Sequence, residues 1–230
     1  MNEIKAVLFD LDGTLVDSLP ELYEGVRRTA EDFHLTSPTK EAVRDMIGRG
    51  VIVLVERLCA HMGVESSQVS QKAFLDRLVE HWAQMDGSYT EFFPGVLEGI
   101  AALREQGIKV GLVTNKWRAL TDEFLQARNI TELFDVVVAG DDCPRNKPYP
   151  DMLEKAMSTL GVLPTETVMV GDSRNDALAG RAASTHVALV ETGYNEGVPI
   201  SEWAREAGFS HTYVNAKKVC DVILQGHFLK

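Results

Sequence analysis

The chain carries two different patterns of hydrophobic and polar positions. From residue 108 onward, short apolar runs typical of buried parallel strands are separated by stretches with apolar residues at helical spacing. Strands that alternate with helices form βαβ units with right-handed crossovers, so this pattern predicts an α/β fold with a parallel sheet. Including one strand near the start of the chain, the predicted strands are 5–9, 108–113, 135–139, 167–170 and 187–190. The helices predicted between them are 120–128, 151–160 and 176–183.

The second pattern covers residues 16–92, where apolar residues recur only at helical spacing and no buried strand is convincing. Phe93-Pro94-Gly95 marks its end, and a further helix at 96–105 leads back to the strands, with Gly107 as its stop. The change of periodicity predicts a helical insertion at 16–92 within a core formed by 1–15 and 93–230. The predicted helices of the insertion are 19–33, 40–47, 52–62 and 68–84.

Two carboxylates, Asp10 and Asp12, follow the first predicted strand. The carboxyl end of a strand is where open α/β sheets place their ligand crevice. Two like charges this close repel, and a divalent cation such as Mg²⁺ offsets that repulsion. The alternative is a tight turn at Asp12-Gly13, because Asp and Gly are both common turn residues. This fragment alone leaves both interpretations open.

Three further fragments carry polar groups at or near predicted strand ends. Thr114 and Asn115 follow the second core strand, where either one also suits a helix N-cap. Lys147 lies between Asn146 and two prolines, and its alternative is a solvated surface lysine. Asp172 and Asp176 follow the strand at 167–170, where they are suited to bind a metal or to cap the next helix.

Taken in order, these four fragments resemble the four motifs of the haloacid dehalogenase-like hydrolase superfamily. The resemblance implies a Rossmann-like parallel sheet with an inserted α-helical cap, which residues 16–92 would form. The fragment Asp10-Leu11-Asp12-Gly13-Thr14 is similar to the phosphotransferase branch, because the dehalogenase branch lacks the second aspartate. We therefore expect phosphoryl transfer and not cleavage of a carbon–halogen bond.

The resemblance also implies roles for individual residues. Asp10 would attack phosphorus and form an aspartyl-phosphate, and Asp12 would act as general acid and base. Thr114 and Lys147 complete the expected catalytic set. Mg²⁺ is the expected cofactor, and its expected ligands are Asp10, Asp12 (also through its backbone carbonyl) and Asp172. Asp176 is expected to act on the metal through a direct ligand or through water.

The expected substrate contacts are less firmly indicated. They are Gly13, Thr14, Asn115 and Arg49. Arg49 lies in Gly48-Arg49-Gly50, which together with residues 193–197 is similar to bacterial phosphoglycolate phosphatases. Its guanidinium would bind a substrate carboxylate, or would extend from a cap helix into solvent. Trp117 replaces a proline that is frequent in such relatives, so the shape of the site entrance is open.

The leading hypothesis is a Mg²⁺-dependent phosphatase for small phosphate monoesters, with 2-phosphoglycolate as the preferred substrate. The alternatives are another sugar or organic phosphate, pyrophosphate, a phosphomutase, and a binding module without turnover. A phosphonatase would need a buried cap lysine to form a Schiff base. The segment 16–92 offers only Lys40 and Lys72, both in polar surroundings, so this reaction is disfavoured.

The composition of the chain limits the classes of partner that it could bind. A formal charge of −11 disfavours nucleic acids and anionic membranes as partners but leaves a small phosphate ester possible. The chain has no apolar stretch near 20 residues and no signal-peptide pattern, so we expect a cytoplasmic protein, monomeric or homodimeric. Three widely spaced cysteines favour reduced thiols.

Overall fold

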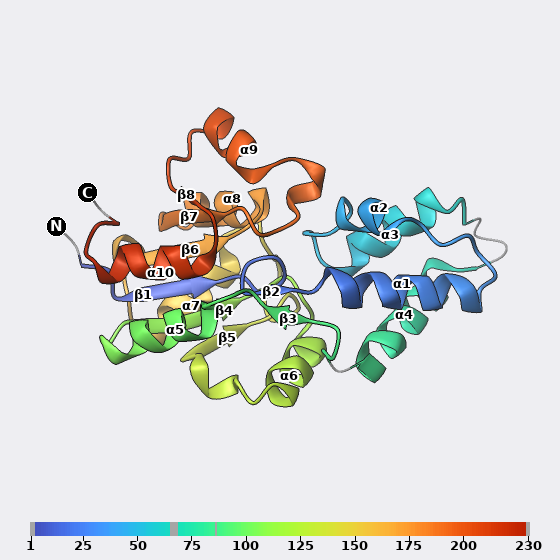
Figure 1. The fold of residues 1–230 in the computed structure, drawn as a ribbon, viewed down its shortest axis with the longest axis horizontal. Helices are drawn as coiled ribbons and strands as arrows, with labels where there is room; N and C mark the ends of the chain where they lie inside the picture. Colours follow the sequence, from blue (N-terminus) through green and yellow to red (C-terminus); the bar gives the residue numbers. More distant parts are fainter. Residues whose placement is uncertain (1–2, 65–68, 86, 229–230) are drawn as a thin grey trace.

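The structure, a computed structural model, describes residues 3–64, 69–85 and 87–228. Its centre is a parallel sheet of six strands in the order β5-β4-β1-β6-β7-β8 (Figure 1). The first predicted strand lies in the middle of this sheet, paired on its two sides with β4 and β6. The predicted α/β class with a parallel sheet is confirmed. The strands are β1 (Ala6–Phe9), β4 (Lys109–Val113), β5 (Val136–Val138), β6 (Thr167–Gly171), β7 (His186–Val190) and β8 (Thr212–Tyr213).

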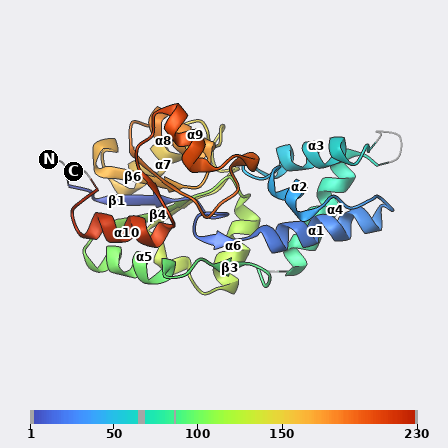
Figure 2. The same cartoon turned by 45° about the horizontal axis from the view of Figure 1, so that its top comes forward.

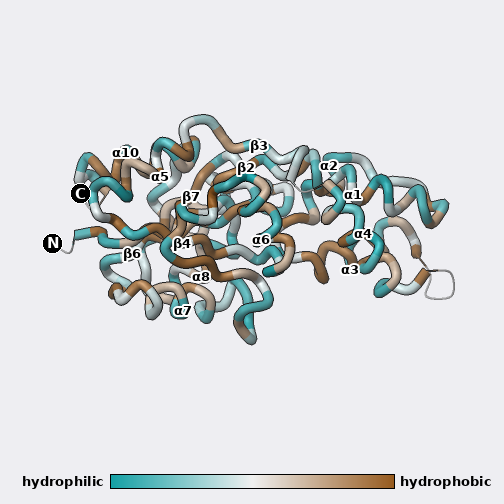
Figure 3. The backbone as a smooth tube through the Cα atoms, turned by 90° about the horizontal axis from the view of Figure 1, so that it is seen from below, coloured by the Kyte–Doolittle hydropathy of each residue, from teal (hydrophilic) through white to brown (hydrophobic). Residues whose placement is uncertain are grey.

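Helices cover both faces of the sheet. Successive side chains of a strand point to opposite faces, so Val7 and Phe9 of β1 pack on one side and Ala6 and Leu8 on the other. The first side is covered by α5 (Val96–Glu105), α10 (Ala216–Leu224) and part of α6 (Arg118–Ala127). The second is covered by α7 (Asp151–Leu160) and α8 (Arg174–Ala182), and α9 (Ile200–Ala207) packs beside β7 (Figure 2). The tube coloured by hydropathy shows the hydrophobic segments gathered in the central strands (Figure 3).

Four helices form a lobe beyond one end of the sheet (Figure 1). We call residues 19–85 the helical lobe. It has a hydrophobic cluster of its own, in which Val26, Leu58, Phe74 and Leu78 are fully buried. Its first and last helices pack closely at Gly25, where an added Cβ would lie 2.3 Å from the Trp82 indole nitrogen. The helices are α1 (Leu19–Asp32), α2 (Lys40–Arg44), α3 (Val51–His61) and α4 (Gln71–Met85).

The two ends of the insertion pair with each other. Val16 and Asp17 form β2, which runs antiparallel to β3 (Glu91–Phe92). The prediction that this segment contains helices only was therefore wrong at both ends. Strands of two residues show no alternation in sequence, and their pairing joins residues about 75 positions apart. The ribbon ties the two connections of the lobe together.

Other differences from the predicted elements lie mainly after residue 190. The strand β8 and the helices α9 and α10 had not been predicted, and α2 is shorter than predicted. Residue 68 of the predicted helix 68–84 lies outside the described residues, and α4 begins at Gln71. No helix in the described part of the chain is long and apolar enough to cross a membrane. Of the predicted core and insertion, residues 1, 2, 65–68, 86, 229 and 230 are outside the description.

Candidate active site

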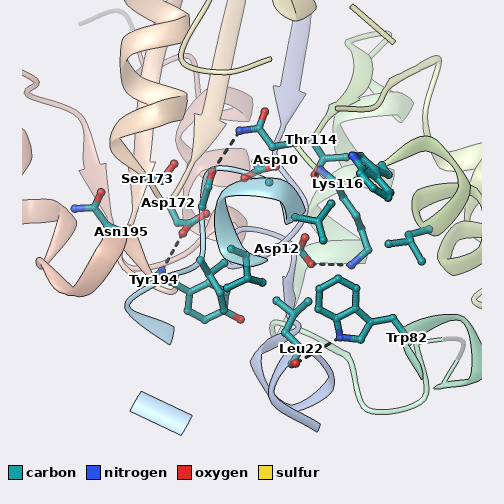
Figure 4. Close-up of a pocket in the computed structure, with 18 residues that line it drawn as sticks. Asp10, Asp12, Leu22, Trp82, Thr114, Lys116, Asp172, Ser173, Tyr194 and Asn195 are labelled. Atoms are coloured by element: carbon teal, nitrogen blue, oxygen red, sulfur yellow. Dashed lines mark hydrogen bonds and ion pairs between the residues drawn. The ribbon is translucent and has the colours of Figure 1, made fainter. Parts of the chain in front are cut away.

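The sheet order brings the four sequence fragments together. Because β1 lies between β4 and β6, the residues that follow these three strands meet at the same carboxyl edge of the sheet. Asp10, Thr114 and Asp172 are therefore neighbours although they are more than 50 residues apart in sequence (Figure 4). The site lies between this edge and the helical lobe.

Three carboxylates and one ammonium form the centre of the site. Asp10, Asp172 and Asp176 each offer an oxygen atom, and these atoms lie within 4.8 Å of one another. The Nζ atom of Lys147 lies 2.9 Å from Asp10 Oδ1 and 2.6 Å from Asp176 Oδ1, and it donates to the carbonyl of Val113 at 2.7 Å. The lysine side chain is only 1% exposed, so the alternative of a solvated surface lysine is excluded.

Burial makes this cluster electrostatically costly. It raises the pKa of Asp10, against the attraction of Lys147, and the charges of Asp176 and Asp12 raise it further. Burial, followed by the charges of Asp176 and Asp10, raises the pKa of Asp172 well above its usual value. Burial alone would lower the pKa of Lys147, but its two carboxylate partners outweigh this effect and raise it. One ammonium thus faces three carboxylates.

The donor set fits Mg²⁺. This ion takes oxygen ligands, usually one or two carboxylates with substrate and water. Asp10 and Asp172 offer such oxygens, and a bound dication would offset the repulsion that raises both pKa values. The geometry therefore suits a divalent cation held by Asp10 and Asp172.

Asp172 is oriented by contacts from two loops. Its Oδ1 accepts a hydrogen bond from Thr14 Oγ1 at 2.8 Å, and its Oδ2 accepts one from the backbone N–H of Tyr194 at 2.9 Å. Two glycines leave room for this carboxylate, since an added Cβ would lie 2.7 Å from Oδ2 at Gly13 and 1.9 Å at Gly193. Thr14 and Gly13, expected at the substrate, thus lie against the carboxylate of Asp172.

Asp176 has both oxygens engaged by the protein. Oδ1 accepts from Lys147, and Oδ2 accepts from the backbone N–H and the hydroxyl of Ser173. Ser173 is the N-cap of α8 and the two residues form a capping box. The helix-capping alternative is therefore correct for Asp176, which also fixes Lys147. The Ser-x-x-Asp spacing carried this signal, but the sequence prediction gave Ser173 no role.

Thr114 and Asn115, which follow β4, make different contacts in the site. Thr114 is buried at the pocket wall, and its Oγ1 accepts a hydrogen bond from the N–H of Lys116 at 3.2 Å. The amide of Asn115 holds the Lys147 loop by accepting from the N–H and donating to the carbonyl of Lys147, both at 3.0 Å. The side chain of Asn115 thus braces the lysine loop instead of pointing freely into the pocket.

Asp12 faces Lys116, a residue to which the sequence prediction gave no role. The two side chains form an ion pair of 3.4 Å between Nζ and Oδ1, and both line the pocket (Figure 4). Glu21 lies nearby and is buried, with its carboxylate accepting hydrogen bonds from Tyr89 N–H and Thr90 Oγ1. Burial raises the pKa of Glu21, while the Lys116 charge opposes this shift.

Arg49 is exposed and is not among the described residues that line the pocket. Its neighbours Gly48 and Gly50 do line it. The carbonyl of Gly48 accepts hydrogen bonds from the side-chain amides of Asn115 at 3.3 Å and Asn175 at 3.2 Å. The structure thus places this loop at the site through its backbone. Arg49 is exposed, as the solvent alternative expects, but it lies in the loop between α2 and α3 and not on a cap helix.

Tyr194 links the lobe connection to Asp172. Besides its backbone contact with that carboxylate, its hydroxyl donates to Asp17 Oδ1 at 2.8 Å and accepts from the N–H groups of Ser18 and Leu19, each at 3.0 Å. Ser18 is the N-cap of α1 but makes no capping bond with its own side chain. A residue of the core therefore caps the first helix of the lobe.

Tyr194→Phe should loosen that connection, because the N–H of Ser18 loses its acceptor and the N–H of Leu19 keeps only Asp17 Oδ1. Lost caps and buried hydrogen bonds cost about 1–2 kcal/mol, so we expect the melting temperature to fall by about 2–8 °C. Tyr149→Phe is the control, since Tyr149 is exposed. Calorimetry checks the stability, and faster amide exchange at residues 16–19 should accompany the loss. Equal stability of the two variants would contradict this role.

Metal binding should stabilise the protein more as the pH rises. Without metal, the raised pKa values of Asp10 and Asp172 mean that the folded protein holds more protons than the unfolded chain above pH 3.8. The free energy of unfolding therefore falls as the pH rises towards the raised values. Mg²⁺ binds the ionised carboxylates, so it should raise the melting temperature by about 5 °C or more near pH 8 and much less near pH 5. Asp172→Asn should abolish the shift, and an equal shift at both pH values would contradict the argument.

The chain is similar to several known proteins in sequence and in overall structure. A phosphoglycolate phosphatase of Nitrosospira multiformis is 38% identical over 203 residues, which cover 86% of this chain and 88% of that protein. A plasmid-borne phosphoglycolate phosphatase of Cupriavidus necator is 39% identical over 193 residues, covering 82% and 81%. The crystal structure of a predicted phosphoglycolate phosphatase from Haemophilus somnus superposes with a TM-score of 0.88 at 28% identity, covering 96% of this chain and 99% of that one.

The motifs of the site fall inside a region that defines a protein family. Residues 7–190 match the family described as haloacid dehalogenase-like hydrolase. This range contains the carboxylate cluster, Lys147 and the whole helical lobe. The chain therefore belongs to the haloacid dehalogenase-like hydrolases.

Proposed function

We propose that the protein is a Mg²⁺-dependent phosphatase for small phosphate monoesters and that it acts through an aspartyl-phosphate on Asp10. The observation that carries the proposal is the buried Lys147, which contacts Asp10 and Asp176 while Asp172 lies within 4.8 Å of both carboxylates. A structural role does not require so many charges in one buried place, because desolvating them is costly. This cluster also disfavours a binding module without turnover.

Mg²⁺ would be held by Asp10 and Asp172, with the backbone carbonyl of Asp12 as a further ligand. When bound, it would neutralise charge on the phosphoryl oxygens and on the clustered carboxylates. Asp176 supports this site by holding Lys147 and the start of α8. Asp176 would therefore act on the metal site indirectly, through the residues that it holds in place.

In the first step, an oxygen of Asp10 forms a bond to phosphorus while the bond from phosphorus to the alcohol oxygen breaks. Asp12 gives its proton to that oxygen, so the alcohol leaves neutral. Lys147, beside Asp10, stabilises the negative charge that gathers on the phosphoryl group. Thr114 lies at the same wall with its hydroxyl hydrogen available to a phosphoryl oxygen.

In the second step, water attacks the phosphorus of the aspartyl-phosphate and gives a proton to Asp12, which is now ionised. The bond between phosphorus and Asp10 breaks, and inorganic phosphate leaves. Asp12 regains its proton and Asp10 its carboxylate, so both residues return to their starting states. Lys116 Nζ lies 3.4 Å from Asp12 Oδ1 and holds this carboxyl group in the pocket.

The relatives suggest the first substrate to test. Two curated relatives at 38% and 39% identity are phosphoglycolate phosphatases, so we propose 2-phosphoglycolate, which would yield glycolate and phosphate. Another organic phosphate is the second candidate, because Arg49, the predicted partner of the glycolate carboxylate, is exposed. Transfer of the phosphoryl group to a sugar hydroxyl instead of water would identify a phosphomutase. The cytoplasmic location and the monomeric or homodimeric state stay predictions.

We also propose that residues 16–92 act as a cap that opens and closes on a core formed by 1–15 and 93–230. The lobe is joined through the β2–β3 ribbon, and Gly48 meets the core side chains Asn115 and Asn175. Closure would exclude water during the first step. Fluoroberyllate with Mg²⁺ should slow amide exchange at both connections, and unchanged exchange there would contradict the proposal.

Acid-quenched turnover of ³²P-labelled 2-phosphoglycolate tests the covalent step. We expect acid-stable, base-labile label on the peptide that contains Asp10, and no label in Asp10→Asn. Borohydride reduction should convert the labelled aspartate to homoserine. Phosphate release from wild-type protein with no label at any quench time would count against the intermediate.

A further inference from the structure

The pocket above the carboxylates has two chemically different walls. Its volume is about 690 Å³, including the solvent at its mouth. One wall is polar and is formed by the catalytic groups proposed above, among them Asp10, Asp12 and Asp172. The opposite wall is apolar, with contributions from α1, the loop between α2 and α3, α3 and α4 of the lobe, and from α6 of the core. Its side chains are those of Leu22, Ile47, Val51, Leu54, Trp82 and Leu120.

The apolar wall offers little to a polar leaving group. The indole N–H of Trp82 already donates to the carbonyl of Leu22 at 3.4 Å, so the ring presents carbon atoms to the pocket. Among the described residues that line the pocket, Lys116 is the single arginine or lysine, and Asp12 already pairs with it. A hydroxyl or carboxylate placed against this wall would lose hydrogen bonds to water without replacement.

Asp12 lies between the two walls. Figure 4 shows it with Asp10 and Asp172 on one side and with Leu22 and Trp82 on the other. The proposed mechanism places the leaving oxygen at Asp12, on the far side of phosphorus from Asp10. The carbon body of the alcohol therefore extends from Asp12 towards the apolar wall.

We propose that this wall is a leaving-group subsite, and that the site hydrolyses phosphate monoesters of alcohols with a branched aliphatic or aromatic body in addition to 2-phosphoglycolate. The inference rests on the phosphatase function proposed above. The chemistry is the same: the phosphorus–oxygen bond to the alcohol breaks as Asp10 bonds to phosphorus, Asp12 protonates the alcohol, and water completes the hydrolysis. The subsite changes which alcohol is bound best.

The size of the expected effect follows from the added apolar contact. Each further methylene that enters an apolar pocket favours a substrate by about tenfold or more. Ethyl phosphate and 3-methylbutyl phosphate differ by three carbons, but both release primary alcohols of similar acidity. A preference between them therefore reports binding of the carbon body and not the reactivity of the ester. We expect kcat/KM to be at least about tenfold higher for 3-methylbutyl phosphate.

The test measures kcat/KM with Mg²⁺ for ethyl phosphate, 3-methylbutyl phosphate and 2-phosphoglycolate. A gain of about tenfold or more for the branched ester over ethyl phosphate supports the subsite. Turnover of 2-phosphoglycolate with equal values for the two alkyl esters overturns the subsite and leaves the phosphatase function standing. Absence of turnover on all three esters overturns the subsite and the assignment of 2-phosphoglycolate, and the phosphatase function itself falls only if sugar phosphates and nucleotides also release no phosphate.

Two leucines on α3 provide a matched pair of variants. Leu54 lines the pocket, whereas Leu58, one turn later, is fully buried in the lobe cluster and does not line it. Leu54→Ala should lower the ratio of kcat/KM between the branched and ethyl esters at least about threefold. Leu58→Ala should leave this ratio unchanged although it also creates a cavity. Both kcat/KM values of a ratio are measured on the same variant, so a smaller fraction of folded protein lowers both equally and leaves their ratio unchanged. An unchanged ratio in Leu54→Ala overturns the subsite.

Discussion

Asp10→Asn should lower phosphate release at least about a thousandfold, because an amide oxygen cannot replace the carboxylate that attacks phosphorus. The same change removes one carboxylate of the proposed Mg²⁺ site. It keeps the size of the side chain and removes one of three clustered negative charges. We therefore expect the folded state to persist while turnover is lost. Initial rates with saturating ester and Mg²⁺, beside calorimetry of both proteins, check this.

Asp122→Asn is the matched control for this prediction. Asp122 forms an ion pair with Arg118 on the surface of α6 and lies outside the pocket. Exposed pairs of this kind contribute at most about 1 kcal/mol, so the control should keep both its rate and its melting temperature. An Asp10→Asn protein that is folded and turns over at more than a tenth of the wild-type rate would rule out nucleophilic catalysis by Asp10.

Lys147→Ala should produce the largest loss of stability. The substitution leaves the carboxylates of Asp10 and Asp176 buried without the ammonium that contacts both. Breaking a buried pair in this way costs about 3–5 kcal/mol. The raised pKa of Lys147 means that its contribution is fully present below pH 10.5 and is lost only above the folded-state value. Near pH 8, above the value of about 7 to which burial raises the pKa of Asp10, we therefore expect the free energy of unfolding to fall by this full amount.

Lys155→Ala is the control, because Lys155 is half exposed and lies 3.8 Å from its partner Asp142. It should change the free energy of unfolding by less than about 1 kcal/mol. The loss in Lys147→Ala should shrink near pH 5, where Asp10, whose pKa is raised by burial, takes up a proton and no longer needs a partner. Denaturant titrations at two pH values measure both effects. A loss below about 1 kcal/mol in Lys147→Ala would contradict the role of the buried ammonium.

The central sheet could be predicted because each of its long strands is a separate apolar run. The residues that follow these runs, such as Asp10 and Asp172, could be placed together because parallel strands end at one edge. The β2–β3 ribbon could not be predicted in the same way. Two residues are too few to show a period, and their partners lie at the other end of the lobe.

The sequence indicated which residues belong to the site better than it indicated which partners their side chains contact. The amide of Asn115 was expected at the substrate, but its partners are the two backbone groups of Lys147, which only the folded loop brings within reach. Arg49 is exposed because the loop presents the carbonyl of Gly48 to the core. Tyr194 caps α1 across a separation of about 175 residues, and no local pattern records such a contact. Residue types indicated the chemistry, while tertiary packing decided the partners.

The most direct test of the account is phosphate release by the wild-type protein with Mg²⁺ and, separately, with excess EDTA. The substrates would be 2-phosphoglycolate, alkyl phosphates, sugar phosphates, nucleotides and pyrophosphate. We predict turnover of at least one monoester with Mg²⁺ and a loss of more than about a hundredfold with EDTA, because Asp10 and Asp172 would then face each other without a cation. Equal rates with and without metal, or no release from any ester, would contradict it.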